Sequence, residues 1–439
     1  MIQEINEDLE KTHISPPSSM DEAKWRDLVN HVQRAQLPTL KLGEDRPYNS
    51  QDFDKSLENR LQSIKTIEIE LKGTDFSLDL DDKITLKHFV APLIVICGEN
   101  AKSTEWSTAK TIEISYKILT LLKTKFFKTD SMIKIFVNRP DVLKLCLNEV
   151  QQKLGKDSWK NHPGAQCSFA WILRQISSPH VSQYLQEFLP FSLRFLDDWE
   201  IKNKLFAIQC LDHIIENVNP SELSKFGYTD VIKSALFHVL NFRELDLTSA
   251  NFVCLFKFLE KCFGRNKCAE DFAKFNVWDE LTKKMLYSMQ IETQKDMKQL
   301  QMKHLTTLLR NLDLGTVRWL TTILNLFSQY VTEPYDEVLV NDTLENLLVI
   351  EELCKERVKF HTDVIYELLV RLLYDLSKED TSSTKHKTFQ LASKALELAA
   401  KESPEEFRRD FDSFDSLEGC EPLKKVVSDI LITLNELNL

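Results

Sequence analysis

Residues 189–215 decide the fold, and their sequence is LPFSLRFLDDWEIKNKLFAIQCLDHII. Apolar residues recur every three to four positions on both sides of an acidic corner formed by Asp197 and Asp198. This period is typical of helices that bury one face against their neighbours. A carboxylate in such a corner can accept hydrogen bonds from the free N–H groups of the next helix. We therefore predict two helices, with Asp197 or Asp198 capping the second and Lys202 or Lys204 pairing with these acids.

The same pattern recurs directly after this stretch. Asn219-Pro220 and Gly227 interrupt the chain, and a new apolar stripe then runs from Ile232 to Val239. Thr248 is placed to cap a further helix whose apolar positions extend to Phe263. A helix, a short corner, a second helix and then the same unit again are typical of HEAT-type solenoids. The sequence therefore predicts an all-α fold, an α-solenoid of degenerate HEAT-like helical hairpins.

The composition supports a helical chain. Only 9 of the 439 residues are glycine, against roughly 7% in average usage, so the chain lacks the turns that β-hairpins require. Helical patterns dominate from residue 56 onward and indicate about sixteen helices, or seven to eight pairs at the period of roughly 40–47 residues typical of HEAT units. The spacing of these patterns is too irregular to align the repeats from the sequence.

We predict three segments along the chain. Residues 1–55 form a poorly organised N-terminal extension, in which Ser15–Ser19 breaks any helix and Asp21–Gln36 fits one amphipathic helix. Docking of this extension along the solenoid and disorder are both compatible with its composition. Residues 56–290 form the N-terminal and central HEAT-like repeats. Residues 291–439 form the C-terminal HEAT-like repeats and are the candidate partner-binding region.

Charge and cysteine usage limit the classes of function. With 56 Lys and Arg against 67 Asp and Glu, the formal net charge is -11, which gives no general attraction to nucleic acid or anionic membranes. The nine cysteines are odd in number and scattered without a CxxC pair, as expected for buried free thiols in a reducing compartment. The N-terminus has no signal-peptide core, and the longest apolar run, Phe89–Cys97, is too short to span a bilayer. We therefore expect a soluble protein in the cytoplasm, with the nucleus as a second compartment.

No catalytic or metal-binding motif stands in the sequence. Glycine-rich phosphate loops, HExxH, GxSxG and kinase motifs are all missing. His213 beside Asp212 is compatible with a proton relay, but the edge of a helix face also accounts for it. Paired acids such as Glu351-Glu352 fit solvated faces. We predict that the protein is not an enzyme and uses no cofactor or metal.

The central stretch resembles a known family. The residues that carry the resemblance are Leu189-Pro190, Asp197-Asp198-Trp199, Lys204, Cys210-Leu211-Asp212-His213-Ile214, Asn219-Pro220 and Gly227. They look like the core of the TELO-two-interacting protein two family, and the match is dense from about Leu189 to Glu260. The resemblance marks Asp197, Asp198, Trp199 and Lys204 as a structural corner.

The resemblance also implies a function. Members of this family are HEAT-repeat subunits of the three-part TTT co-chaperone, which helps the ninety-kilodalton heat-shock chaperone mature PI-three-kinase-like kinases. It implies a scaffold or adaptor in a hetero-oligomer with the larger Tti subunit and the Tel subunit, in contact with the kinases and the chaperone only through them. No nucleic acid or membrane partner is implied.

Two other classes of protein remain as alternatives. An importin-like carrier or another HEAT-repeat transport or assembly adaptor would also be an acidic helical solenoid, but its inner groove should carry regularly spaced Trp and Asn. The seven tryptophans of this chain have no constant spacing. An unrecognised enzyme has no motif in its favour.

A partner surface is predicted in the C-terminal third. The helices expected over 336–358 and 362–378 carry apolar residues around more than half of their circumference, whereas a surface helix needs a stripe of only about 100°. Such helices must be covered on two sides, either by neighbouring helices or by a second chain. The candidate partner-binding residues are Leu348, Val349, Leu369, Val370 and Leu373.

Overall fold

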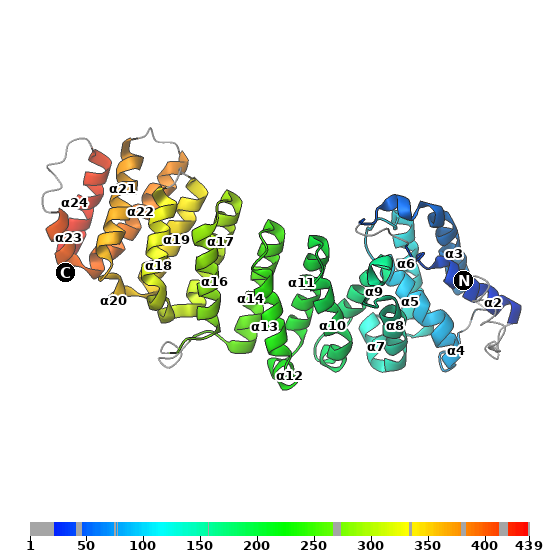
Figure 1. Cartoon of the computed structure of the whole chain (residues 1–439). Helices are drawn as coiled ribbons and strands as arrows, with labels where there is room; N and C mark the ends of the chain where they lie inside the picture. Colours follow the sequence, from blue (N-terminus) through cyan, green and yellow to red (C-terminus); the bar gives the residue numbers. More distant parts are fainter. Residues whose placement is uncertain are drawn as a thin grey trace. The chain divides into compact units, whose positions relative to one another are not determined.

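The computed structural model describes residues 22–40, 46–73, 76, 78–156, 158–266, 274–332, 336–378, 383–411 and 420–437. Every regular element in these ranges is helical, and none of them contains a strand (Figure 1). Successive helices form hairpins that pack on one another, so the predicted all-α solenoid fold is confirmed. The chain divides into two compact units. Unit 1 comprises residues 1–197 and 209–222, and unit 2 comprises residues 198–208 and 223–439.

The two compact units divide the chain at other positions than residues 55 and 290. The three predicted segments therefore remain a prediction. The helix α11, Ile201–Asn217, contributes residues to both units.

Unit 1 is built around one apolar helix. The other helices of unit 1 are α2 (Glu22–Ala35), α3 (Asp54–Lys72), α4 (Lys83–Thr85), α6 (Ala109–Leu121), α7 (Met132–Asn138), α8 (Pro140–Lys153), α9 (Pro163–Arg174) and α10 (Leu185–Leu196). Short 3-10 and π-helical turns join several of them. The central helix is α5, Ala91–Glu99, whose nine residues are all buried and which packs against α6, α8 and α9. A helix that is apolar all round must be covered all round, which explains the long apolar run in the sequence.

The described part of the predicted N-terminal extension packs into unit 1. The amphipathic helix expected over Asp21–Gln36 is α2, which packs on α3 and buries Trp25. Beyond it, the Leu40 N–H donates to the Asn161 carbonyl oxygen at 3.0 Å, and the Leu40 side chain joins a cluster with Phe53 and Trp106. Leu40 and Phe53 are therefore part of the core of unit 1. The predicted break at Ser15–Ser19 lies outside the described residues.

Unit 2 contains the remaining hairpins. Its helices are α13 (Tyr228–Val239), α14 (Leu245–Phe263), α16 (Val277–Ile291), α17 (Lys295–Leu312), α18 (Leu320–Thr332), α19 (Glu337–Leu353), α20 (Lys355–Val358), α21 (Thr362–Lys378), α22 (Ser383–Glu402), α23 (Pro404–Phe411) and α24 (Glu421–Glu436). The helix α12, Pro220–Lys225, ends in unit 2. Predicted and observed bounds agree for the helix over 362–378.

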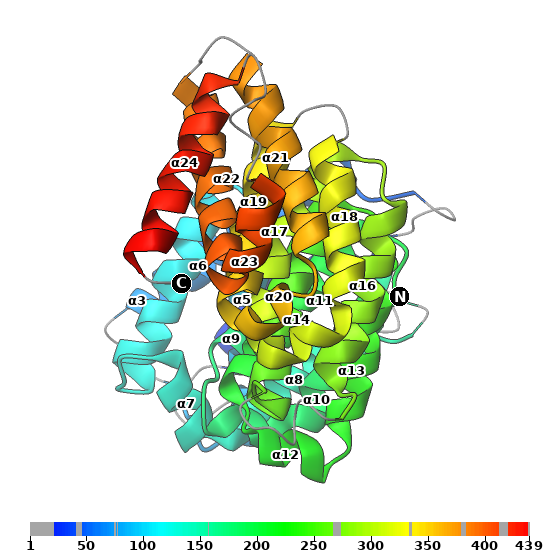
Figure 2. The ribbon, with the colours of Figure 1, turned by 90° about the vertical axis from the view of Figure 1, so that its left-hand side faces the viewer.

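The hairpins of unit 2 are stacked in two layers. The second helices of successive hairpins, α14, α17, α19 and α22, pack one against the next. The first helices α16, α18 and α21 do the same, while α13 packs on α14. Figure 2 views this stack from its C-terminal side, where α21, α22 and α24 lie. Because neighbouring helices in a hairpin run in opposite directions, the first helices all begin at the same edge of unit 2, which is the lower edge in Figure 1.

One corner on this edge has an unusual backbone. The helix α17 ends at Leu312, and Asp313 takes a positive φ of 52°. A 3-10 turn over Asp313–Trp319 then delays the start of α18 to Leu320. Gly315 is needed for close packing, because a Cβ atom there would lie 3.3 Å from Nδ2 of Asn266.

The α10–α11 corner is present as predicted, and Glu200 and Asp198 accept hydrogen bonds in it. The N–H groups of Asn203 and Lys204 donate to the Glu200 carbonyl oxygen at 3.1 and 3.2 Å, so Glu200 is the first residue to accept a helical bond in α11. Asp198 Oδ2 accepts a hydrogen bond from the side-chain amide of Asn203 at 2.5 Å. Asp197 has an exposed side chain, and its N–H donates to Leu193 at the end of α10.

The two lysines of this corner contact further groups, and their pairing with the aspartates stays a prediction. Lys202 Nζ lies 3.4 Å from Glu200 Oε2. Lys204 is buried, with Nζ 4.3 Å from the centre of the Phe242 ring. Trp199 is 59% exposed. The corner thus anchors a buried lysine and leaves its tryptophan at the surface.

A buried carboxyl group in unit 2 contradicts the prediction of a solvated acidic face at Glu351-Glu352. Glu351 is only 3% exposed, and neither of its carboxylate oxygens has a hydrogen-bond partner among the described residues. Burial, together with the nearby charge of Glu402, raises the pKa of Glu351 well above its ordinary range. Its neighbour Glu352 is exposed. The last turn of α19 therefore points one of the two acids into the core.

We predict that Asp198→Ala destabilises the protein and that Asp197→Ala does not. The Asp198 carboxylate holds the amide of Asn203, and losing one hydrogen bond to a charged group costs about 1–3 kcal/mol. Asp197→Ala is the matched control, because its side chain is exposed. Urea unfolding followed by circular dichroism measures both. Equal midpoints for the two variants would show that the Asp198 bond has no structural role.

We also predict that Glu351→Gln stabilises the protein at neutral pH. The folded state keeps the Glu351 proton at pH values where the unfolded chain has lost it, because the folded pKa is raised. The stability contributed by this group therefore falls as pH rises above the ordinary glutamate pKa of about 4.3. Glutamine removes the titration and should raise the melting temperature at pH 7 with little effect at pH 4.

The control for this substitution is Glu352→Gln on the exposed side of the same turn. It should leave the pH profile of the melting temperature unchanged. If both variants behave alike, the Glu351 carboxyl is not held protonated by burial.

Candidate functional site

The described residues offer no assembled metal site. No group of three or more His, Cys, Asp or Glu side chains among them lies close enough to hold a metal ion. None of the helices in the described ranges is both long and apolar enough to cross a membrane. His213 lies within hydrogen-bond distance of a backbone oxygen, with Nε2 2.8 Å from Ile176 O. This places it at a contact between α11 and the connection that follows α9, within unit 1.

The thiols are free and mostly buried, as predicted. Eight of the nine cysteines lie in the described residues, where none forms a disulfide. Burial raises the pKa of Cys167 and of Cys354 to about 11 and that of Cys210 to about 12. Because the thiolate is the reactive form, such cysteines are poor nucleophiles. The ninth, Cys268, lies outside the described residues.

The five predicted partner-binding residues divide into two groups. Val349, Leu369 and Leu373 are buried by the helices of unit 2 itself, where α19 packs against α17, α18 and α22, and α21 packs against α18, α22 and α24. Leu348 and Val370 are half-buried. Neighbouring helices therefore supply the cover for three of the five. A partner laid on these two helices would touch Leu348 and Val370 first.

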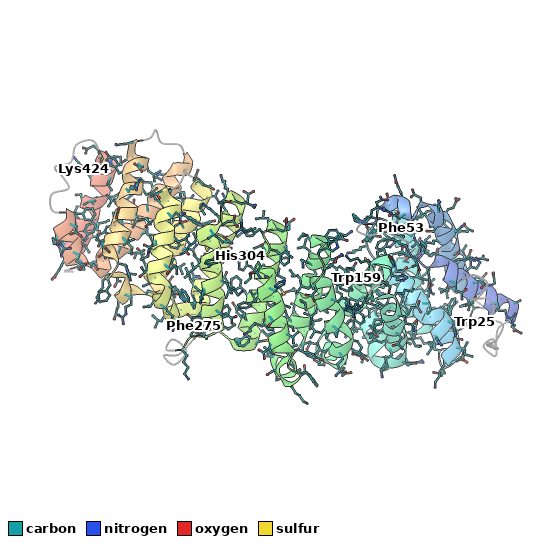
Figure 3. All side chains as sticks on the ribbon, viewed as in Figure 1. Trp25, Phe53, Trp159, Phe275, His304 and Lys424 are labelled. Atoms are coloured by element: carbon teal, nitrogen blue, oxygen red, sulfur yellow. The ribbon has the colours of Figure 1, made fainter. Side chains whose placement is uncertain are left out.

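A row of basic–aromatic pairs lies at the edge of unit 2 where the first helices begin. Before each of α13, α16, α18 and α21 stands a cation followed directly by an aromatic residue, and this aromatic residue lies one or two positions before the helix begins. We call this row the basic–aromatic edge, and its members are Lys225-Phe226, Lys274-Phe275, Arg318-Trp319 and Lys359-Phe360. Phe275 is labelled at this edge in Figure 3.

The aromatic rings of this edge face solvent. Phe226, Phe275 and Phe360 are 52%, 59% and 65% exposed, and Trp319 is half-buried. The Lys225 and Lys359 ammonium groups lie 5.6 and 5.3 Å from the centres of the rings that follow them. Cation–π contacts at exposed sites contribute about 0.5–1 kcal/mol each. They orient each ring without burying it.

The middle of the edge is held by a polar network. Asn276 caps α16 by accepting from the Trp278 N–H at 2.9 Å, and the Asn276 N–H donates to Asp279 Oδ2 at 3.1 Å. The buried Asp279 carboxylate also accepts from Trp319 Nε1 at 2.8 Å and pairs with Arg318. The Phe275 and Trp319 rings then lie 6.4 Å apart. Two successive corners are thereby fixed to each other.

An open hollow lies between the third and fourth pairs of the edge. Its volume is about 820 Å³, and it lies between the 3-10 turn before α18 and the corner at α20. Leu314 contributes an exposed apolar wall, while Arg318, Lys355 and Arg357 contribute positive charge. Glu352 and Glu356 also line the hollow.

The sequence contains a recurring cation–aromatic dipeptide at this edge, which the apolar stripes of the helices do not reveal. The cations of the four pairs, at positions 225, 274, 318 and 359, are separated by 49, 44 and 41 residues, close to the period of HEAT units. The helices differ in length from one hairpin to the next. The four cation–aromatic pairs, in contrast, all stand just before the first helix of a hairpin. The dipeptide alone does not define the repeats, because it also occurs inside helices, as at Arg194-Phe195 and Lys257-Phe258.

Comparisons with known proteins match the central part of the chain. Residues 144–336 match the model of the Tti2 family. This range contains the α10–α11 corner and the first three pairs of the basic–aromatic edge. TELO2-interacting protein 2 of Mus musculus is 26% identical over 313 residues, and that of Rattus norvegicus is 27% identical over 314 residues. The protein of the same name in Homo sapiens is 26% identical over 303 residues.

The alignments cover 69%, 69% and 67% of this chain and 60%, 60% and 59% of the three relatives, in the order given. The chain therefore spans about three fifths of the length of the curated relatives it matches.

Solved structures with a similar backbone include Kap95p, in a complex where it binds RanGDP, with a TM-score of 0.48 at 13% identity. Kap95 in complex with Nup1 gives a TM-score of 0.46 at 12% identity. Each comparison covers 94% of this chain and 47% of the other chain. The family model and the three relatives agree with each other and with the residues that carried the resemblance, and the central part of the chain is similar to the Tti2 family.

Proposed function

We propose that this chain is a non-catalytic scaffold or adaptor subunit of the TTT co-chaperone complex. In this role it supports the maturation and stability of PI-three-kinase-like kinases together with the ninety-kilodalton heat-shock chaperone. The observation that carries the proposal is the match of residues 144–336 to the Tti2 family, supported by relatives that are named for interaction with TELO2.

The architecture of the matched region is consistent with a scaffold. Repeats that contact only their neighbours produce extended surfaces, which solenoid proteins use to hold other proteins. In unit 2 a hollow of about 820 Å³ is open to solvent and lies at the basic–aromatic edge. Its lining includes neither a histidine nor a serine hydroxyl. A protein ligand suits such a surface better than a small substrate does.

The direct partners of this chain, in this proposal, are the larger Tti subunit and the Tel subunit. The kinases and the chaperone are reached through them. The assembly acts in the cytoplasm, with the nucleus as a second compartment. An acidic chain with a formal charge of -11 is not expected to bind nucleic acid or anionic membranes.

The first prediction from this proposal is that affinity purification of the full chain recovers the two other TTT subunits. The partners should be present in amounts comparable to the bait and should persist in moderate salt, because obligate interfaces are largely apolar. Quantitative mass spectrometry measures the recovery, with the bait tag alone as the control. Recovery of a GTPase and transport cargo in place of the TTT subunits would contradict the proposal. So would ATP hydrolysis by the purified chain that one point substitution abolishes.

The second prediction tests the partner surface proposed on α19 and α21. Charge substitutions at the half-buried positions, Leu348→Glu and Val370→Glu, should reduce capture of the larger Tti subunit at least about tenfold, as loss of an interface core contact does. Exposed positions on the same two helices, Glu345→Lys and Glu367→Lys, are the matched controls. Point substitutions are preferable to truncation before α19, because α19 covers α17 and its removal would expose the core.

Melting temperatures separate loss of binding from loss of folding in this experiment. If both half-buried variants stay folded and capture the partner as well as the control variants do, the proposed surface is not the interface.

A further inference from the structure

A pocket in unit 2 lies where the first helices end, opposite to the basic–aromatic edge. Its volume is about 370 Å³, and the corner between α13 and α14 forms it together with the hairpin of α16 and α17. Phe252, Met285 and Met297 are buried and form apolar walls. Tyr287 and Ile291 are 66% and 47% exposed and form the rim. The whole lining lies within the part of the chain that matches the Tti2 family model.

Two buried oxygen atoms in the lining of this pocket have no hydrogen-bond partner among the described residues. Glu292 is 4% exposed, and its Oε1 accepts from the N–H groups of Thr293 and Gln294 at 2.8 and 2.9 Å, but its Oε2 has no donor. Gln301 is also 4% exposed, and its Nε2 donates to Ser288 Oγ at 2.9 Å, while its Oε1 has no donor. Buried polar groups are almost always hydrogen-bonded. Two acceptors without donors in one pocket therefore indicate that a ligand supplies the donors.

The walls and the acceptors together select a basic side chain with an apolar stem. A single water molecule, with a share of about 30 Å³, would leave most of the pocket unfilled. The methylene groups of lysine or arginine pack on apolar walls while the charged head reaches polar groups. A guanidinium group is more weakly hydrated than an ammonium group and stacks on aromatic rings such as that of Tyr287 at the rim. Arginine therefore suits this pocket better than lysine does.

The charges at the mouth require an acidic residue beside this arginine. Arg243 and Lys284 are exposed and also line the pocket. The Nζ atom of the buried Lys204 lies 4.3 Å from the centre of the Phe242 ring, which forms part of the wall. These cations would repel an arginine that stood alone. An aspartate or glutamate next to it in the ligand balances this repulsion.

We propose that the pocket binds an arginine side chain of a partner protein, from a segment in which an acidic residue stands beside the arginine. The guanidinium group donates to Glu292 and Gln301, and the acidic residue contacts Arg243 and Lys284 at the mouth. An arginine anchored in a desolvated pocket is a common centre of binding energy in protein interfaces. The proposal rests on the scaffold function in that the ligand belongs to another protein, but it does not depend on which complex that protein is part of.

The test begins with a selection of random peptides of about twelve residues, displayed on phage, against the purified full chain. The Glu292→Gln variant is used in a parallel selection. Its amide oxygen can still accept from Thr293 and Gln294, whereas the amide nitrogen replaces the unpartnered acceptor with a donor. Peptides retained only by the unsubstituted chain should contain arginine with aspartate or glutamate beside it. If the selection yields no such peptides, or if both proteins retain them equally, the proposal is overturned.

Synthetic versions of a selected peptide then define the ligand. Fluorescence anisotropy should show that citrulline in place of arginine, which keeps the shape without the charge, raises Kd at least about tenfold. Lysine in place of arginine should raise Kd by a smaller factor. A citrulline peptide that binds as tightly as the arginine peptide overturns the proposal. So does free agmatine that binds more tightly than the peptide, because the pocket would then be a site for a small amine.

Protein variants locate the site. Glu292→Gln should raise the Kd of the arginine peptide at least about tenfold, and Gln301→Met at least about threefold. Glu367→Gln is the matched control, because Glu367 is exposed and lies on α21, away from the pocket. Lys284→Gln should weaken binding only while the peptide keeps its acidic residue.

Melting temperatures separate binding from folding in these variants. If Lys284→Gln lowers the melting temperature and leaves Kd unchanged, Lys284 is itself the partner of Glu292 and the proposal is overturned. Equal loss of binding in Glu292→Gln and Glu367→Gln would place the peptide elsewhere and overturn it as well. Neither result affects the recovery of TTT subunits in affinity purification, so the two proposals fail independently.

Discussion

The structure of unit 2 depends on one constraint: a helical hairpin with a single apolar face cannot bury that face alone. Each hairpin satisfies it by stacking on the next, which places α14, α17, α19 and α22 in one layer and α16, α18 and α21 in another. Helices with apolar residues over more than half of their circumference, such as α21, are accommodated because neighbours lie on several sides. The stacking also dictates that all first helices start at one edge. The basic–aromatic edge is thus a geometric consequence of the stack.

Hydrogen bonds between polar groups at the corners fix the position of each hairpin along its neighbour. Asn266 donates from Nδ2 to the Leu312 carbonyl oxygen at 3.1 Å and accepts from Asn276 at 3.0 Å, which ties the end of α17 to the start of α16. Asp279 extends the same network to Trp319. Buried hydrogen bonds of this kind cost free energy when one partner is lost, so neighbouring repeats cannot slide past each other. Rigid corners then hold the Phe275 and Trp319 rings 6.4 Å apart.

Local patterns in the sequence predicted the helices well and their surroundings less well. The helix over 362–378 and the amphipathic helix near the N-terminus follow from their apolar period. The period states which face of a helix is apolar but not which neighbour covers it. For that reason Leu369 and Leu373 read as surface candidates although α22 and other helices bury them, and Glu351 read as solvated although the last turn of α19 points inward.

Uncovering the buried side chains of α19 and α21 would lower the stability of unit 2, whereas covering the exposed rings would not. This difference decides which surface is free to bind a partner. A partner that reached Leu369 or Leu373 would have to displace helices of unit 2, at a cost of several kcal/mol for each large side chain uncovered. Phe226, Phe275 and Phe360 are already exposed, so burying them against a ligand gains free energy at about 25 cal/mol per Å² without any unfolding. Three of the four pairs of the edge lie inside the region that matches the Tti2 family, and the fourth continues the row beyond it. Covering this edge therefore requires no change in the core.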